Sequence, residues 1–244
     1  MGGIERAART ASSPEGEEIV PGLWRWSAPH PEWDPEAQPG SSGDWDRLVG
    51  CVLYELPERV VLIDPLLPAE PQRAGLLAWL DRLVDERAVS ILTTIHWHSR
   101  SRAELARRYR GRGSRAWNYI PPQVRRRPLR GAGETVFWLP GVAALVVGDR
   151  LVGAGRAGAG GSGAGGSGAG DASSAAAQLR VCPESWLAGV RADRAEVAAL
   201  LEPLTELPIE RVLVSHGAPV LAGAHHALVQ AIAEARGRYS SGVV

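Results

Sequence analysis

The stretch VSILTTIHWH at 89–98 decides how the rest of the sequence is interpreted. It begins as a run of apolar and β-branched residues, which is typical of a buried strand, and its two histidines come where that run ends. In an extended chain residues i and i+2 point to the same side, so we expect His96 and His98 to face one site and Trp97 to pack on the other side. That spacing is suitable for two imidazoles that chelate one metal ion.

Runs on either side of this stretch predict a mixed sheet covered by helices. Upstream, LVGCVLYEL (48–56) and VVLID (60–64) are β-rich runs at hairpin spacing, and a helix is expected near 71–85. Downstream, AALVVGD (143–149) and RVLVSHG (211–217) predict two more buried strands. The interleaving of strands and helices indicates an α/β (α+β) fold class.

Stretches of low complexity suggest where the domain begins and ends. Residues 1–18 are small, polar and charged, and predict a loose N-terminal tail. Residues 154–177 are almost all Gly, Ala and Ser, which cannot fill a core, and predict a flexible insertion. The part that follows is short for an independent domain. We therefore expect a single domain at 19–237, interrupted by the insertion and followed by a C-terminal tail at 238–244.

Composition excludes several classes of function. With 244 residues, 45% of them hydrophobic and 22% charged, the chain can build one substantial core. All 27 basic residues are Arg, which excludes Schiff-base lysines and the P-loop lysine. No apolar run approaches the roughly 18 to 20 residues of a membrane span, and no secretory signal is evident, so we expect a cytoplasmic protein without a membrane partner. Cys51 and Cys182 lie in apolar runs and are expected to be buried free thiols.

Four residues that could bind a metal stand at the ends of strand-like runs: His96, His98, Asp149 and His216. Polar groups in such positions tend to gather at one edge of a sheet. A carboxylate beside neutral imidazoles suits a borderline metal such as zinc. The sequence therefore predicts one zinc, or another divalent ion, held by these four residues.

Four motifs in order resemble those of the metallo-β-lactamase superfamily. They are VVLIDP (60–65), TTIHWHSRS (93–101), LVVGD (145–149) and LVSHG (213–217), which are similar to the strand-end motifs of that family, among them His-x-His-x-Asp-His, Gly-Asp and His-Gly. The resemblance implies a four-layer αββα sandwich with the site at one edge, between two sheets. It also implies hydrolase ancestry and a small-molecule substrate.

The departures from the family motifs matter as much as the matches. Arg100 and Ser101 stand where the family has the Asp and the last His of His-x-His-x-Asp-His, and Val142 stands where the family has the His of Pro-Gly-His. A dinuclear centre is therefore not expected. The resemblance then implies a mononuclear or impaired site that hydrolyses an ester, thioester or amide, with Asp149 and Arg100 as catalytic residues and Arg100 steadying an anionic part of the substrate.

Two more residues receive structural interpretations. The resemblance implies that Asp64 supports the site through hydrogen bonds in its loop. Ser101, three residues before Glu104, predicts a capping box at the start of a helix over 101–111.

Three outcomes remain open at the expected site. The four ligands could bind one metal. Alternatively no metal binds and the fork of Arg100 holds a carboxylate or phosphate, which would make the chain a non-catalytic anion-binding or interaction protein. In the third outcome the histidines are inherited polar residues of a site that no longer works.

Nucleic-acid binding is a second alternative function. Between Arg100 and Arg130 there are eleven arginines and one acidic residue, Glu104, and Trp117 and Tyr119 could stack on bases. An arginine-rich solvated helix face accounts for the same pattern, and we favour it. The expected partner is therefore a small-molecule substrate, with an anionic group, and not a nucleic acid.

Overall fold

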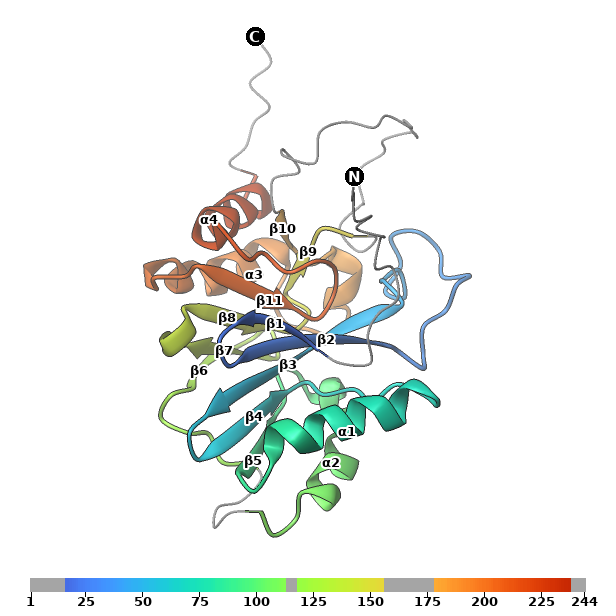
Figure 1. The fold of residues 1–244 in the computed structure, drawn as a ribbon. Helices are drawn as coiled ribbons and strands as arrows, with labels where there is room; N and C mark the ends of the chain where they lie inside the picture. Colours follow the sequence, from blue (N-terminus) through green and yellow to red (C-terminus); the bar gives the residue numbers. More distant parts are fainter. Residues whose placement is uncertain (1–15, 113–117, 156–177, 238–244) are drawn as a thin grey trace, which may run out of the picture.

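The computed structural model describes residues 16–112, 118–155 and 178–237. Their strands and helices stack as helices, sheet, sheet and helices (Figure 1). In chain order the elements, with η marking 3₁₀ helices, are β1 (Glu17–Val20), β2 (Leu23–Pro29), β3 (Leu48–Leu56), β4 (Arg59–Ile63), α1 (Gln72–Val84), β5 (Ala88–Leu92), η1 (His96–Ser99), α2 (Arg102–Arg108), β6 (Arg125–Leu129), β7 (Glu134–Leu139), η2 (Pro140–Val142), β8 (Ala144–Val147), β9 (Leu151–Gly153), β10 (Leu179–Val181), η4 (Glu184–Leu187), α3 (Arg194–Leu201), η5 (Glu202–Glu206), β11 (Arg211–Val214) and α4 (Ala224–Ala235).

Two sheets form the middle layers. The first has the strand order β1-β2-β3-β4-β5 and the second the order β11-β8-β7-β6, while β9 and β10 form a separate antiparallel pair. The pairs β4–β5 and β8–β11 are parallel, and the other neighbours in the two sheets are antiparallel. Because parallel strands end at the same edge of a sheet, each sheet gathers the residues that follow two of its strands.

The strand β4 of the first sheet is buried on both faces, which explains why it shows no polar alternation. In β4, Val60 and Leu62 pack with Trp79 of α1, whereas Val61 and Ile63 pack toward the second sheet. Successive side chains of a strand point to opposite faces, so a strand between two apolar layers must be apolar throughout.

The second sheet is covered in the same way. Leu145 and Val147 of β8 pack with Val197 of α3 and Leu228 of α4, and Val146 packs toward the first sheet. The three buried clusters thus separate four layers, with α1 beside the first sheet and α3 and α4 beside the second (Figure 1). The expected four-layer αββα sandwich is confirmed.

Other expectations have mixed outcomes. β1 begins at Glu17, inside the stretch expected to be a tail. Residues 1–15, 156–177 and 238–244 lie outside the described part of the chain, so the tails and the insertion stay predictions.

Both cysteines are buried and free, as expected. In the described ranges, we find no helix with the length and apolar character needed to cross a membrane.

The two sheets meet directly where β3 passes the end of β11. Gly50 N donates to Ser215 O at 2.7 Å, and Val49 forms an isolated antiparallel bridge with His216. A Cβ on Gly50 would lie 2.5 Å from Val214 O, so only glycine permits this approach. The contact fixes the segment that carries His216 against the first sheet.

Gly50→Ala is therefore expected to lower the free energy of unfolding by about 1–3 kcal/mol, because the added methyl group overfills the seam, the contact of Val49 and Gly50 with the end of β11. Denaturant unfolding of the variant measures the change. Gly43→Ala is the control, since a Cβ there meets Ala37 Cβ at 3.4 Å and Ser41 Oγ at 3.8 Å, which are ordinary contacts. Equal stability of the two variants would mean that the seam is not closely packed.

Candidate metal centre

Three strand ends bring His98, Asp149 and His216 together. His98 lies in η1, just beyond β5, while Asp149 follows β8 and His216 follows β11. Val147 and Val214 are register partners in the parallel pair β8–β11, so the residues two positions further on emerge side by side. The three residues are only 3%, 7% and 6% exposed, respectively.

Asp149 lies at the spacing expected of a shared metal ligand from each of the two histidines. Asp149 Oδ1 lies 3.0 Å from His98 Nε2 and 3.4 Å from His216 Nε2, and one ligand atom of each residue lies within 4.8 Å of the others. Bonds of about 2.0 to 2.2 Å in a tetrahedral arrangement place neighbouring ligand atoms about 3.3 Å apart. Asp149 Oδ1 is buried and forms no well-aligned hydrogen bond with a described residue, although both imidazole nitrogens lie within 3.4 Å of it. These residues fit a divalent metal ion.

Asp64 holds His98 from the other side. Asp64 Oδ2 lies 2.9 Å from His98 Nδ1, and Asp64 Oδ1 accepts a hydrogen bond of 2.8 Å from the backbone N–H of Thr94. The Thr94 hydroxyl also donates to Asp64 Oδ2. A carboxylate on one ring nitrogen fixes the proton there and leaves the other nitrogen free to bind a metal. The supporting role expected for Asp64 agrees with these contacts.

His216 is held by aromatic contacts instead. The rings of Trp45 and Trp186 meet its imidazole edge-on, with centroids 5.5 Å and 5.0 Å away. His216 Nδ1 is buried and has no hydrogen-bond partner among residues 16–112, 118–155 and 178–237. Packing therefore orients this ring, and its pKa is lowered, chiefly by burial.

The charges of the cluster are strongly coupled. Burial opposes protonation of His98, but Asp149 and Asp64 outweigh it and raise the pKa of His98 to about 9. Burial would likewise raise the pKa of Asp149, yet the neighbouring imidazoles, His98 first, hold that pKa well below its usual range. The metal-free cluster therefore keeps a proton on His98 between two carboxylates, and a bound metal must displace it.

Glu134 supports the loop that carries Asp149, a role that the sequence did not reveal. Its Oε1 accepts a hydrogen bond from Gly148 N at 2.9 Å, and its Oε2 accepts from Asp149 N at 2.8 Å and from Arg150 N at 2.9 Å. Burial, with Asp149 acting in the same direction, raises the pKa of Glu134 to about 7. An acidic residue just before the apolar run of β7 was the available signal.

His96 is not brought to the cluster, and the expectation that it faces the same site as His98 is wrong. The chain turns into the 3₁₀ helix η1 at His96 instead of staying extended. With about three residues per turn, positions i and i+2 point in different directions. His98 is consequently buried, while His96 and Trp97 are exposed. The structure brings together three of the four predicted ligands.

The residues that replace family ligands have other contacts. Arg100 lines the pocket beside the cluster, and its Nη1 donates to Asp64 O at 3.3 Å. Ser101 Oγ accepts a hydrogen bond from Leu67 N at 2.9 Å, and no side-chain capping bond forms at the start of α2, so the predicted capping box is wrong.

Val142 does not border the site. It lies in η2, which joins β7 to β8 at the Ala144 end of β8. Asp149 follows the other end of β8, beyond Val147. The comparison of Pro140–Val142 with Pro-Gly-His therefore pointed to the wrong end of this hairpin.

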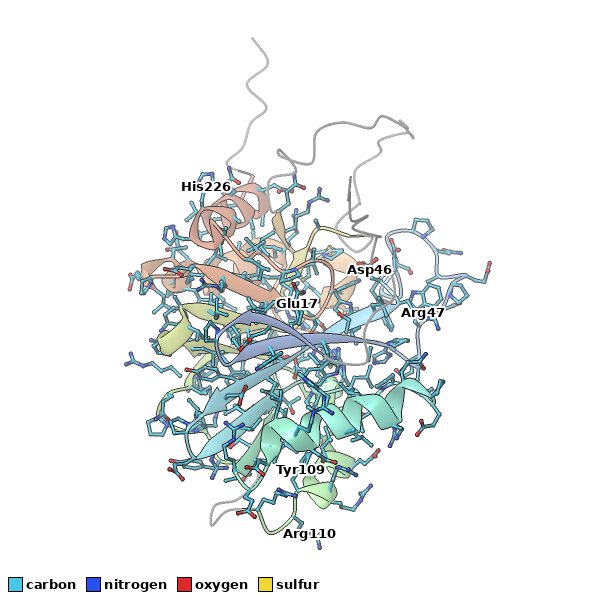
Figure 2. The ribbon with its side chains drawn as sticks, viewed as in Figure 1. Glu17, Asp46, Arg47, Tyr109, Arg110 and His226 are labelled. Atoms are coloured by element: carbon cyan, nitrogen blue, oxygen red, sulfur yellow. The ribbon has the colours of Figure 1, made fainter. Side chains whose placement is uncertain are left out.

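A pocket of about 370 Å³ opens in front of the cluster. His98, Asp149 and His216 line it together with Arg100, and three tryptophans, Trp45, Trp97 and Trp186, form much of its wall. No other arginine of the described parts of 100–130 lines this pocket. Arg110, for example, lies at the lower end of the molecule in Figure 2, whereas Asp46, the neighbour of Trp45, lies in the upper half.

No protein-family model matches the sequence, and no curated protein matches it. Solved structures do resemble the fold. A metallo-β-lactamase from Erythrobacter litoralis is 12% identical with a TM-score of 0.50, over 90% of this chain and 92% of that one. A metallo-β-lactamase from Pontibacter korlensis is 14% identical with a TM-score of 0.50, over 89% of this chain and 98% of that one. The layers, the strand ends and these similarities together show that the chain has the metallo-β-lactamase fold.

Proposed function

We propose that the chain is a mononuclear metal-dependent hydrolase that cleaves an ester, thioester or amide of a small anionic molecule. The main support is the cluster of His98, Asp149 and His216, whose ligand atoms lie within 4.8 Å of one another, with buried Asp149 Oδ1 close to both imidazole nitrogens. The proposed cofactor is one zinc or a similar divalent ion. We also propose a cytoplasmic location, as the sequence suggested.

Each residue of the cluster has a separate role in holding the metal ion. A divalent ion held here supplies Lewis acidity, which lowers the pKa of water and polarises a carbonyl group. His98 and His216 offer imidazole nitrogens, and Asp149 adds the negative charge that favours a cation. Asp64 keeps the remaining ring proton of His98 on Nδ1, so that Nε2 stays available.

Arg100 is the residue that we assign to the substrate. Its side chain lines the same pocket as the three ligands, and its Nε is buried without a partner in the described chain. A guanidinium group in a partly closed pocket favours a carboxylate or phosphate, which it can bind with two parallel hydrogen bonds. The substrate would therefore carry an anionic group near its scissile bond.

Zinc-loaded protein should be assayed against chromogenic esters, thioesters and amides, each with and without a carboxylate. We expect turnover that requires zinc and that is lost in Asp149→Asn. If zinc binds and no member of the panel is cleaved, but carboxylates bind in a manner that requires Arg100, the chain is a non-catalytic anion-binding protein and the hydrolase proposal fails.

Arg100→Gln is expected to raise KM for an anionic substrate about tenfold, because a charge-assisted hydrogen bond contributes about 1.5–3 kcal/mol. Its effect on the matched substrate without the carboxylate should be small. Steady-state kinetics on the two substrates measures the difference. An equal rise in KM for both substrates would mean that Arg100 does not bind the carboxylate.

A further inference from the structure

Trp97 makes a direct contact with one of the three candidate ligands. Its Nε1 donates a hydrogen bond of 2.7 Å to Asp149 Oδ2. The sequence had suggested that Trp97 packs into the sandwich, yet the side chain is 46% exposed. Burial of apolar surface therefore does not explain why a tryptophan stands here.

The hydrogen bond makes the two oxygens of Asp149 different. Oδ2 is occupied by the indole N–H, whereas Oδ1 lies 3.0 Å from His98 Nε2 and 3.4 Å from His216 Nε2. The carboxylate thus presents a single oxygen, Oδ1, toward the common point of His98 and His216. A donor on the outer oxygen of a ligand carboxylate orients the inner one.

The indole ring is itself held in place. The guanidinium of Arg150 lies 5.7 Å from the centroid of the Trp97 ring, within the range of a cation–π contact. Arg150 is fully buried, and it donates from Nε to Ala132 O at 2.8 Å and from Nη1 to Trp186 O at 3.3 Å. The hydrogen-bonded guanidinium of Arg150 therefore helps to hold the exposed indole with its N–H directed at Asp149.

We propose that Trp97 is a positioning residue that makes Asp149 bind the metal through Oδ1 alone. This inference rests on the proposed metal site. It predicts that loss of the indole N–H weakens metal binding and frees Oδ2 to become a second ligand atom, even though no atom that touches the metal has been changed.

Co²⁺ titration of Trp97→Phe tests the proposal, because phenylalanine keeps an aromatic ring and removes the N–H. We expect about tenfold weaker Co²⁺ binding, the lower end of what outer contacts contribute to metal sites. We also expect a visible Co²⁺ spectrum that is weaker than that of the wild type, since an added oxygen ligand raises the coordination number. Trp24→Phe is the matched control. It removes an indole N–H that donates to another carboxylate, Glu55 Oε1, at 2.7 Å, outside this pocket, and should leave the spectrum unchanged.

A second measurement follows the hydrogen bond itself in the metal-free protein. The indole ¹H–¹⁵N signal that is missing in Trp97→Phe should be protected from exchange in the wild type, and Asp149→Asn should shift it. If wild-type protein binds Co²⁺ and Trp97→Phe matches it in affinity and spectrum, the positioning role is wrong. If the wild type itself binds no Co²⁺, the proposed function fails, whatever the indole signal shows.

Discussion

His98→Ala is expected to reduce zinc affinity by more than about 100-fold, because the loss of a ligand must exceed the 10–100-fold that outer contacts contribute. It should also lower the free energy of unfolding of the metal-free protein by about 3–5 kcal/mol, the usual effect of removing one partner from a buried ion pair. The imidazole of His98 lies between the two carboxylates, 2.9 Å from Asp64 Oδ2 and 3.0 Å from Asp149 Oδ1. Without it, two buried negative charges would repel each other with no positive charge between them. Competition with a chelator and denaturant unfolding measure the two effects.

The matched control is His96→Ala, two residues away. His96 is exposed and lies outside the ligand cluster, so zinc affinity and stability should both stay close to those of the wild type. Equal losses from the two substitutions would contradict the placement of His98 alone in the site. They would favour the extended His-x-His arrangement that the sequence suggested.

Zinc affinity is expected to rise about 50-fold between pH 7 and pH 9. The buried His98 has its pKa raised to about 9, so over this range the metal must displace one proton, which changes the apparent affinity about tenfold for each pH unit. The dependence should level off above pH 9. Because this pKa is raised in the folded state, the stability that the proton gives the metal-free protein is present below about pH 6.5 and is lost as the pH rises through 9.

Asp64→Asn is the control for the pH effect. It removes one of the two carboxylates that raise the pKa of His98 but none of the three candidate ligands. The rise in affinity should therefore end at a lower pH. Zinc affinity that is flat between pH 7 and pH 9 in the wild type would mean that His98 carries no proton in the metal-free site.

Much of the two sheets could be predicted because several of their strands are uninterrupted apolar runs in the sequence. Runs such as VVLI in β4 and ALVV in β8 are buried on both faces, so they contain no polar residue to confuse the pattern. The strand β6, RRRPL, was missed for the opposite reason. It is an edge strand whose first four residues are exposed, and its arginines and proline are the residues that protect such edges.

The candidate site was predictable in part. Asp149 and His216 follow parallel neighbours, and strand ends of that kind are visible in the sequence as polar residues after apolar runs. His96 was assigned wrongly because no local signal marks where the chain leaves β5 and tightens into η1. Glu134 was marked only by its place before an apolar run, and Trp97 not at all, because each acts through a contact with Asp149 or its backbone, more than ten residues away in the chain.

Anomalous diffraction at the zinc absorption edge, from crystals of zinc-loaded protein, shows directly which side chains hold the ion. We expect one anomalous peak per chain, about 2.0 to 2.2 Å from His98 Nε2, His216 Nε2 and Asp149 Oδ1, and none beside His96. A peak that includes His96, or the absence of any peak at these three residues in zinc-loaded crystals, would contradict this expectation.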